Sequence, residues 1–480
     1  MRHFAVIDEG TTSTRVIIFD ESGKMLSSAR RILTTFYPKP GLVEQSADEI
    51  YSKTIEALEE AIQRCKCSPD FIGITNQRET IVAWDAKSGK PLYNAIVWRD
   101  KRGQALCEKI KTSGYENLVR EKTGLLLDPY FSASKMKWFI DNVSKVKEKL
   151  SKGELMFGTV DSYLVWKLTK KHLTEASNAC RTLLFNISTS SWDEELLKIF
   201  GVPAETLPEV KPSAYDFGSS PYGKICGILG DQQSSLFGNR CYEAGQVKCT
   251  YGTGAFVLAN IGNSNLSNPF GLLKTIAWKI GDETTYALEG SILASGENIT
   301  WIKKLGLIKD ENEIEPLASS IPSSEGVYFV PALDGLGAPQ WIPQARGAFF
   351  GLSSFHTKAH LIRSILDAMA FSTVEVVDAF RKSGVFISKI SVDGGGAKNS
   401  LLVQTLADAS NVPVERSRFH EMTAYGAFLI SGIGAKMWSL EELKRGKNPC
   451  DLFQPTKDVS NEYSKWKSAQ ELSIKWSQRA

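Results

Sequence analysis

The 480-residue sequence lacks several features that would assign a protein to a common class at once. The P-loop pattern GxxxxGK followed by Ser or Thr does not occur, which excludes a P-loop nucleotide site. Apolar runs stay well short of the ~18 residues that a membrane-spanning helix needs. The formal net charge is only +3, so charge does not indicate binding to nucleic acid or to a membrane surface.

Histidine is scarce and cysteine is scattered. The five histidines do not stand at metal-ligand spacing, and Cys65-Lys66-Cys67 is a CxC rather than the CxxC of zinc and redox sites. The amino-terminal apolar run, Phe4–Ile7, is too short for the core of a signal peptide. We therefore expect a cytoplasmic protein with eight reduced cysteines and no zinc site.

Strand and helix patterns alternate along the chain, which predicts an α/β fold. Phe4–Asp8 and Arg15–Asp20 have the apolar content of strands and enclose a small polar turn. A helix is expected to begin after Ser46, because the hydroxyl of Ser46 and the carboxyl of Glu49 have capping-box spacing.

The second half of the chain repeats this organisation. Gln246–Asn260 again shows a strand, a Gly-Thr turn and a strand. A chain of this length usually forms more than one domain, and we place two at residues 1–240 and 241–480. Each is expected to contain a mixed sheet flanked by helices, and the two are expected to face each other across a catalytic cleft.

Three Gly-rich turns are candidates for phosphate binding, because successive backbone N–H groups can converge on an anion. Asp8–Arg15 combines Gly10 with hydroxyls and a cation, and Asp8 is placed to hold Mg²⁺ through water. Tyr251–Gly254 is shorter, and Val392–Ala397 leads into a helix whose amino-terminus suits a nucleotide. Each turn alone is also compatible with an ordinary loop. Together they indicate a nucleotide site.

These turns resemble the phosphate-1, phosphate-2 and adenosine motifs of the actin/hexokinase/Hsp70 ATPase superfamily. Within it, Tyr130–Trp138 and Gly347–Asp367 are similar to the two signatures of the FGGY carbohydrate kinases. The resemblance extends from Asp8 to about Phe453, is strongest to members that phosphorylate glycerol, and implies two actin-like (ribonuclease H-like) domains. Its most specific stretches are Gly73–Thr80, Tyr93–Trp98, Asp128–Ser132, Gly230–Gln233 and Gly335–Pro339.

The resemblance implies ATP-dependent phosphorylation of glycerol to sn-glycerol 3-phosphate, with Mg²⁺ on the phosphates and Asp231 as the catalytic base. It assigns the polyol pocket to Arg78, Glu79, Trp98, Tyr130, Asp231, Gln232 and Phe256. It assigns nucleotide contacts to Thr11, Thr12, Ser13, Arg15, Thr253, Gly296, Thr300, Gly395 and Asn399, and the metal to Asp8. A homo-oligomer, dimer or tetramer, is expected, without a nucleic-acid partner and without membrane insertion.

Three positions depart from the family pattern. Glu9, Arg99 and Thr300 stand where glutamine is usual, beside the phosphate turn, at the rim of the polyol pocket and near the nucleotide. Two alternatives stay open. One is a kinase for another small polyol or sugar, such as erythritol, xylulose or dihydroxyacetone. The other is a non-catalytic nucleotide switch of the actin or Hsp70 type, against which the full set of pocket residues argues.

Overall fold

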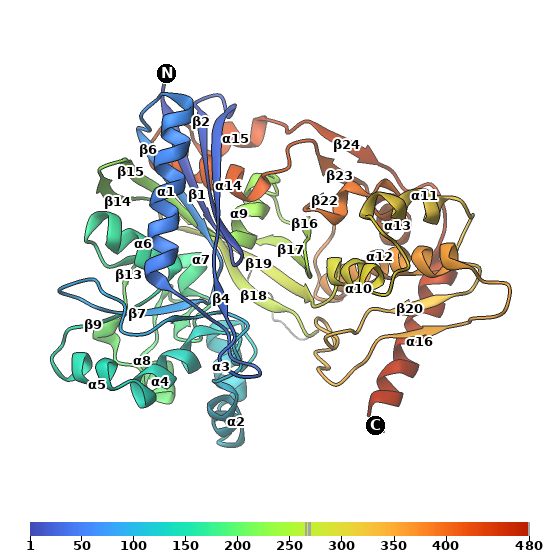
Figure 1. The fold of residues 1–480 in the computed structure, drawn as a ribbon, viewed down its shortest axis with the longest axis horizontal. Coiled ribbons are helices and arrows are strands. Elements are labelled where there is room, and N and C mark those ends of the chain that lie inside the picture. Colours follow the sequence, from blue (N-terminus) through green and yellow to red (C-terminus); the bar gives the residue numbers. More distant parts are fainter. Residues whose placement is uncertain (265, 267–269, 479–480) are drawn as a thin grey trace. The chain divides into compact units, whose positions relative to one another are not determined.

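The computed structural model, which describes residues 1–264, 266 and 270–478, divides into two compact units (Figure 1). Unit 1 comprises Met1–Arg240, Lys274–Tyr286 and Glu421–Gly446. Unit 2 comprises Cys241–Leu273, Ala287–His420 and Lys447–Ala480. Both combine a mixed sheet with helices, so the predicted α/β class is confirmed. The division into domains 1–240 and 241–480 stays a prediction, because compactness does not test independent folding.

The main sheet of unit 1 has the strand order β18-β14-β15-β6-β1-β2-β3. Strand β1 pairs antiparallel with β2 and parallel with β6, and β6 pairs parallel with β15. The strands are β1 (His3–Glu9), β2 (Ser13–Asp20), β3 (Met25–Ile32), β6 (Phe71–Asn76), β14 (Ala214–Ser220), β15 (Gly223–Gly230) and β18 (Leu273–Ile280). The predicted amino-terminal strand–turn–strand is therefore present.

Helices pack on both faces of this sheet. Ala5 of β1 shares a buried core with Leu58 of α1 and Leu164 of α6, whereas its neighbour Phe4 packs edge-on against Phe428 of α14, with ring centroids 5.0 Å apart. This alternation follows from the pleat of the strand. The helices of unit 1 are α1 (Ala47–Cys65), α2 (Gln104–Thr112), α3 (Glu116–Thr123), α4 (Ser132–Asn142), α5 (Ser144–Ser151), α6 (Val160–Thr169), α7 (Ala176–Ala179), α8 (Glu194–Phe200), α9 (Asp231–Gly238), α14 (Met422–Gly434) and α15 (Leu440–Arg445).

Helix α1 begins where the sequence predicted it. Ser46 is the N-cap, and its hydroxyl accepts a hydrogen bond from the backbone N–H of Glu49 at 3.2 Å. The helix runs along the strands of unit 1 in Figure 1. Its first turns therefore lie beside the carboxyl end of β1, where Thr54 donates to the carboxylate of Glu9 at 2.9 Å.

A second, antiparallel sheet of unit 1 has the order β4-β5-β8-β7-β9. Its strands are β4 (Thr35–Phe36), β5 (Glu44–Gln45), β7 (Ile81–Asp85), β8 (Ala95–Ile96) and β9 (Leu155–Thr159). Two short pairs complete the unit: β10 (Leu173–Glu175) with β13 (Glu209–Lys211), and β11 (Phe185–Asn186) with β12 (Ser191–Trp192). The second sheet matters for the site because β5 carries Gln45 and β8 leads to Trp98.

Unit 2 has a main sheet of order β24-β23-β22-β16-β17-β19, of which β19 begins in unit 1. Its strands are β16 (Gln246–Tyr251), β17 (Ala255–Gly262), β19 (Glu283–Ile292), β22 (Lys389–Asp393), β23 (Val414–Ser417) and β24 (Cys450–Phe453), with a separate pair β20 (Tyr328–Val330) and β21 (Ala348–Phe350). Its helices are α10 (Gly296–Lys304), α11 (Ile314–Ser319), α12 (Lys358–Lys382), α13 (Ser400–Ser410) and α16 (Ser460–Ser477). Within the described part of the chain, no helix is long and apolar enough to cross a membrane.

One expectation about the cysteines is wrong. Cys65 and Cys67 form a disulfide at the end of α1, whereas reduced thiols were expected throughout. The intervening Lys66 adopts a left-handed conformation with φ of 54°, and the Cα atoms of the two cysteines lie 5.3 Å apart. This separation falls within the range that a disulfide bridges.

Candidate active site

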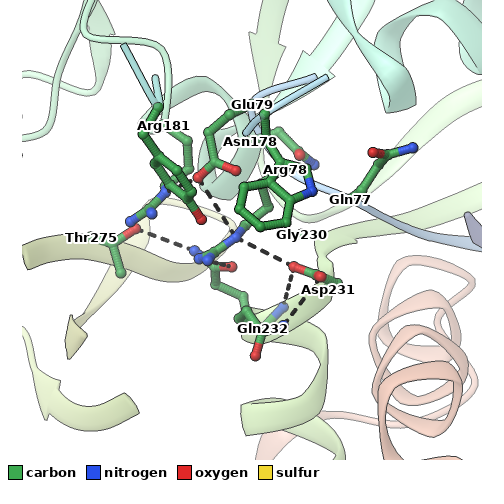
Figure 2. A network of polar contacts seen from close by, with 12 residues as sticks. Gln77, Arg78, Glu79, Asn178, Arg181, Gly230, Asp231, Gln232 and Thr275 are labelled. Carbon is green, nitrogen blue, oxygen red and sulfur yellow. Dashed lines mark hydrogen bonds and ion pairs between the residues drawn. The ribbon is translucent and has the colours of Figure 1, made fainter. Parts of the chain in front are cut away.

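Asp231 is the first residue of α9, where β15 ends. Its carboxylate accepts hydrogen bonds from the backbone N–H of Gln232 at 2.7 Å and from the side-chain amide of Gln232 at 3.1 Å. The Nε of Arg78 lies 3.3 Å from the same carboxylate (Figure 2). The start of a helix also favours negative charge. These groups fix the direction of the carboxylate, while its side chain stays 32% exposed and can meet a ligand.

Arg78 and Glu79 stand on the tight turn between β6 and β7. The backbone N–H of Thr80 donates to the carbonyl of Arg78 at 2.7 Å, which gives Glu79 a left-handed φ of 62°. A residue other than glycine in this conformation stores about 1–3 kcal/mol of strain, and such strain is common at functional sites. The surroundings hold it: the hydroxyl of Ser132 donates to the carbonyl of Glu79 at 3.0 Å.

The carboxylate of Glu79 lies between two guanidinium groups. Arg181 donates through Nε to Oε1 of Glu79 at 2.6 Å, and Arg78 Nε lies 3.8 Å from the same oxygen. Figure 2 shows the side chains of Arg78, Glu79 and Arg181 converging. All three are almost fully buried, with Arg181 at 0% exposure. The sequence predicted Arg78 and Glu79 as site residues but not Arg181. Only the structure reveals the role of Arg181, because it places Arg181 and Asn178 beside the pocket.

Trp98, expected as an aromatic wall of the pocket, lies beside Tyr130, which was expected to hold a polyol hydroxyl. The rings of Trp98 and Tyr130 lie edge to face, with centroids 5.4 Å apart. The indole Nε1 of Trp98 donates to the hydroxyl of Thr11 at 2.9 Å, and its backbone N–H donates to the hydroxyl of Thr80 at 3.1 Å. Two half-exposed aromatic faces beside fixed polar groups form a surface suited to a small polyol.

Tyr130 is held from behind by a buried lysine that sequence reasoning did not single out. Lys135, in the first turn of α4, is fully buried and donates to the carbonyls of Pro129, Tyr130 and Phe131 at 2.5, 2.7 and 3.2 Å. Burial lowers the pKa of Lys135 to about 8. Lysine is rarely buried unless it has such partners. The only sign of this role in the sequence is that Lys135 lies within the signature segment Tyr130–Trp138.

The first Gly-rich turn connects β1 to β2 as predicted. Gly10 donates its N–H to the carbonyl of Ser13 at 3.0 Å, which closes the turn. Arg15, on β2, forms an ion pair with Glu421, with Nη1 and Oε1 2.5 Å apart. The predicted residues Thr11, Thr12, Ser13 and Arg15 therefore belong to one short segment at the carboxyl edge of β1, in the same unit as Asp231.

Two acidic side chains end β1. Burial, together with the charges of Asp231 and Glu421, raises the pKa of Asp8 to about 7. Burial likewise raises the pKa of Glu9 to about 8. Asp8 thus stands where negative charge accumulates. Among the described residues, no group of three or more histidine, cysteine, aspartate or glutamate side chains is arranged to hold a metal by itself.

The remaining predicted residues lie in unit 2. Thr253 stands in the turn between β16 and β17, and its carbonyl accepts from the N–H groups of Ser295 and Glu297 at 2.9 and 3.0 Å. Gly296 begins α10, close to the same turn: a side chain there would lie 2.6 Å from the carbonyl of Gly252. The turn and the helix start therefore form one backbone surface.

Three other predicted residues of unit 2 have distinct settings. Thr300, on α10, is exposed and donates its hydroxyl to the carbonyl of Gly296 at 3.3 Å. Gly395 has open space where a side chain would stand. Asn399 caps α13, because its side chain accepts from the N–H of Leu402 at 2.9 Å. Phe256, on β17, is partly exposed.

Comparison with known proteins identifies the family of the chain. Residues 4–238 match the N-terminal domain and residues 247–435 the C-terminal domain of the FGGY family of carbohydrate kinases. The chain is 45% identical to glycerol kinase 2 of Sulfolobus acidocaldarius over 99% of its length and 98% of that protein, and 44% identical to glycerol kinase of Bacillus subtilis over 96% and 97%. The crystal structure of Plasmodium falciparum glycerol kinase with ADP superposes with a TM-score of 0.94 at 35% identity, covering 98% of both chains. The chain belongs to the FGGY family of carbohydrate kinases.

Proposed function

We propose that this chain transfers the γ-phosphoryl group of ATP to glycerol, giving sn-glycerol 3-phosphate and ADP. The observation that carries the proposal is the fixed carboxylate of Asp231, bound by Arg78 and by Gln232 at the start of α9. Relatives at about 45% identity over nearly the whole chain are glycerol kinases, which supports the choice of substrate.

Asp231 is the base in this proposal. Its carboxylate orients the attacking hydroxyl and accepts the hydroxyl proton as the new P–O bond forms and the bond to the leaving ADP breaks. Phosphoryl transfer depends mainly on positioning and on charge stabilisation, so a well-positioned carboxylate suffices. The Nε of Arg78, 3.3 Å away, keeps the carboxylate aimed between turnovers.

We assign the polyol hydroxyls to Arg78, Glu79, Gln232 and Tyr130, and the carbon backbone to the ring of Trp98. An unpaired buried hydroxyl costs about 1–3 kcal/mol, so a triol needs a fixed donor or acceptor for each oxygen. The Arg181–Glu79 contact at 2.6 Å supports this role, because it fixes the acceptor before the polyol arrives. Phe256 is assigned as a second aromatic wall on the strength of the family pattern alone.

Mg²⁺ fits the acidic end of β1. Burial is the main cause of the raised pKa of Asp8, and the negative charges of Asp231 and Glu421 add to it. A divalent cation held by Asp8 through water and by the phosphates would neutralise this charge and the charge that develops on the phosphoryl group. Thr11, Thr12, Ser13 and Arg15 are assigned to the phosphates.

For the rest of the nucleotide we assign Thr253, Gly296, Gly395 and Asn399, with Thr300 as a further contact. The backbone surface made by the Thr253 turn and the start of α10 supports the first two. We also propose that the enzyme acts in the cytoplasm and assembles as a dimer or tetramer, which light scattering after gel filtration measures directly.

The test is a coupled assay with ATP, Mg²⁺ and a panel of glycerol, dihydroxyacetone, glyceraldehyde, erythritol and xylulose. We expect glycerol to give the highest kcat/KM and Asp231→Asn to lower kcat by about 10²- to 10⁴-fold, the usual contribution of a general base. If another polyol is preferred, the proposed phosphoryl transfer stands and the assigned substrate is wrong. ATP binding without phosphorylation of any member would refute the kinase.

One observation favours a longer polyol as an alternative substrate. Arg99 follows Trp98 where family members carry glutamine, and its Nη2 donates to the hydroxyl of Tyr37 at 2.7 Å. A guanidinium at the pocket rim offers an additional donor to a longer polyol. Arg99→Gln distinguishes the two cases: it leaves glycerol turnover unchanged in a glycerol enzyme and lowers turnover of the longer polyol in the alternative.

A further inference from the structure

The carbonyl oxygens of the Gly10–Ser13 turn are all engaged in hydrogen bonds. The carbonyl of Ser13 accepts from the N–H of Gly10 at 3.0 Å, and the carbonyl of Thr12 accepts from the N–H of Leu33 at 3.0 Å. The remaining two accept from side chains, as described next. This matters because a turn that binds an anion must direct N–H groups toward it and keep its carbonyl oxygens turned away.

Two buried glutamines bind those remaining carbonyls. Gln45 Nε2 donates to the carbonyl of Thr11 at 2.5 Å, and Gln77 Nε2 donates to the carbonyl of Gly10 at 3.3 Å. Gln77 Nε2 also donates to Oε1 of Gln45 at 3.0 Å, which joins the two amides. Their side chains are only 1% and 2% exposed. Such buried amides are held by their partners and move little.

The same network continues to the aromatic wall of the polyol pocket. The hydroxyl of Thr80 donates to Oε1 of Gln77 at 2.9 Å and accepts the backbone N–H of Trp98 at 3.1 Å. The indole of Trp98 then donates to the hydroxyl of Thr11 at 2.9 Å. The hydrogen bonds thus form a closed ring through the side chains of Gln45, Gln77 and Thr80. Figure 2 shows that the side chain of Gln77 points away from Arg78 and Asp231.

We propose that Gln45 and Gln77 are positioning residues that hold the Gly10–Ser13 turn ready for phosphate, and that the ring through Thr80 and Trp98 couples nucleotide binding to polyol binding. The inference rests on the proposed function of the site. A polyol that packs on Trp98 restricts the indole and its partner Thr11. Restricting Thr11 lowers the conformational entropy that the turn must lose when the phosphates bind. By linkage, the nucleotide strengthens polyol binding by the same factor.

The experiment measures the affinity of the full-length protein for ADP with Mg²⁺ by calorimetry, with and without saturating glycerol. We expect glycerol to tighten ADP binding by about fivefold or more in the wild type. Gln77→Met and Gln45→Met should each weaken ADP binding by about five- to thirtyfold, because a buried carbonyl loses its donor. Gln470→Met is the matched control: this buried glutamine of unit 2 binds Glu375 instead, and its loss should leave ADP binding unchanged.

Thr80 separates coupling from folding. Thr80→Val keeps the shape of the side chain and removes the hydroxyl that joins Gln77 to Trp98, whereas Thr80→Ser retains that hydroxyl. We expect Thr80→Val to abolish the effect of glycerol on ADP affinity and Thr80→Ser to preserve it. Thr80→Val should also lower the thermal midpoint, because Oε1 of Gln77 and the N–H of Trp98 lose their partner, so ADP affinity is measured well below the unfolding transition.

The outcomes separate this inference from the function itself. Wild-type protein that fails to phosphorylate any polyol refutes the proposed function. The coupling is refuted if the wild-type protein is active but glycerol does not change its affinity for ADP. It is also refuted if glycerol changes the ADP affinity of the Thr80→Val variant as much as that of the wild type. Folded Gln45→Met and Gln77→Met variants with wild-type ADP affinity refute the positioning role.

Discussion

Replacing Lys135 by methionine tests how the pocket is supported. The ammonium group is fully buried and donates to three consecutive carbonyls, those of Pro129, Tyr130 and Phe131. Those carbonyls belong to the loop that presents the ring of Tyr130 to Trp98. Methionine has nearly the same length but no donor. The change therefore leaves the volume filled and removes only the hydrogen bonds and the charge.

The expected magnitude follows from two opposing effects. Hydrogen bonds from a charged donor contribute about 1.5–3 kcal/mol each, or about 6 kcal/mol for three. The pKa of Lys135 falls from 10.5 to about 8 through burial, and at 1.36 kcal/mol per pKa unit this burial costs about 3 kcal/mol at neutral pH. The difference predicts that Lys135→Met lowers the free energy of unfolding by about 3 kcal/mol.

Part of this loss should appear in catalysis. If about half of it is expressed as loosening of the Tyr130 loop, glycerol binding weakens by about 1.4 kcal/mol, or tenfold in KM. Urea denaturation gives the free energy of unfolding, and steady-state kinetics at saturating ATP gives the KM for glycerol. Lys137→Met is the matched control, because Lys137 lies on the same helix and forms an exposed i,i+4 pair with Asp141. Such pairs contribute about 0.5 kcal/mol or less.

A Lys135→Met protein with wild-type stability and wild-type KM for glycerol would refute this reasoning. It would show that the three carbonyls find other donors, or that the loop is held by its own packing. Loss of stability with an unchanged KM would instead show that the loop conformation is independent of Lys135.

Two further predictions concern other buried groups. Arg181→Lys should raise the KM for glycerol about tenfold while ADP affinity stays within twofold, because lysine cannot reproduce the guanidinium contact with Glu79 at 2.6 Å; an unchanged KM in steady-state assays would contradict it. His172 packs edge-on against Trp84, and burial lowers its pKa from 6.5 to about 4. Between pH 4 and 6.5 the imidazole of His172 is therefore protonated more readily in the unfolded chain than in the folded chain. The neutral, buried His172 thus contributes about 3 kcal/mol to the free energy of unfolding above pH 6.5, and this contribution is lost as the pH falls toward 4. His172→Gln should flatten this part of the stability–pH curve measured by urea denaturation; a curve with the wild-type slope would contradict the assignment.

Local signals in the sequence were sufficient for many elements. The strands around Gly10, the cap of α1 at Ser46 and the helix that follows Val392–Ala397 occur where predicted. Each depends on residues close together in sequence: alternating apolar residues in the strands, and the Ser46 hydroxyl before the first turn of α1. Such interactions do not depend on the rest of the chain, so the sequence alone defines them. The predicted return contact of Glu49 is absent, because its carboxylate binds Thr34 instead.

The candidate site was predictable only through its peculiar motifs. Arg78, Glu79, Trp98, Tyr130 and Asp231 were named from a family pattern, and the structure brings all five into one unit. Their mutual geometry is a separate matter. The ion pair of Arg78 with Asp231 joins a turn to the start of a helix far away in the sequence, so no local sequence pattern predicts it.

The sequence by itself therefore determined the class of fold and the main elements, and its motifs were enough to propose the pocket residues. Tertiary structure alone decided how those residues are held: Arg181 reaches Glu79 across 102 positions of sequence, and Gln45 meets Gln77 across 32. Arginine and glutamine are ordinarily surface residues, so their type gives no sign of burial. Only the tertiary fold, which packs α7 against β15 and brings Gln45 of β5 to the Gly10–Ser13 turn, gives these side chains partners that offset the cost of burying them.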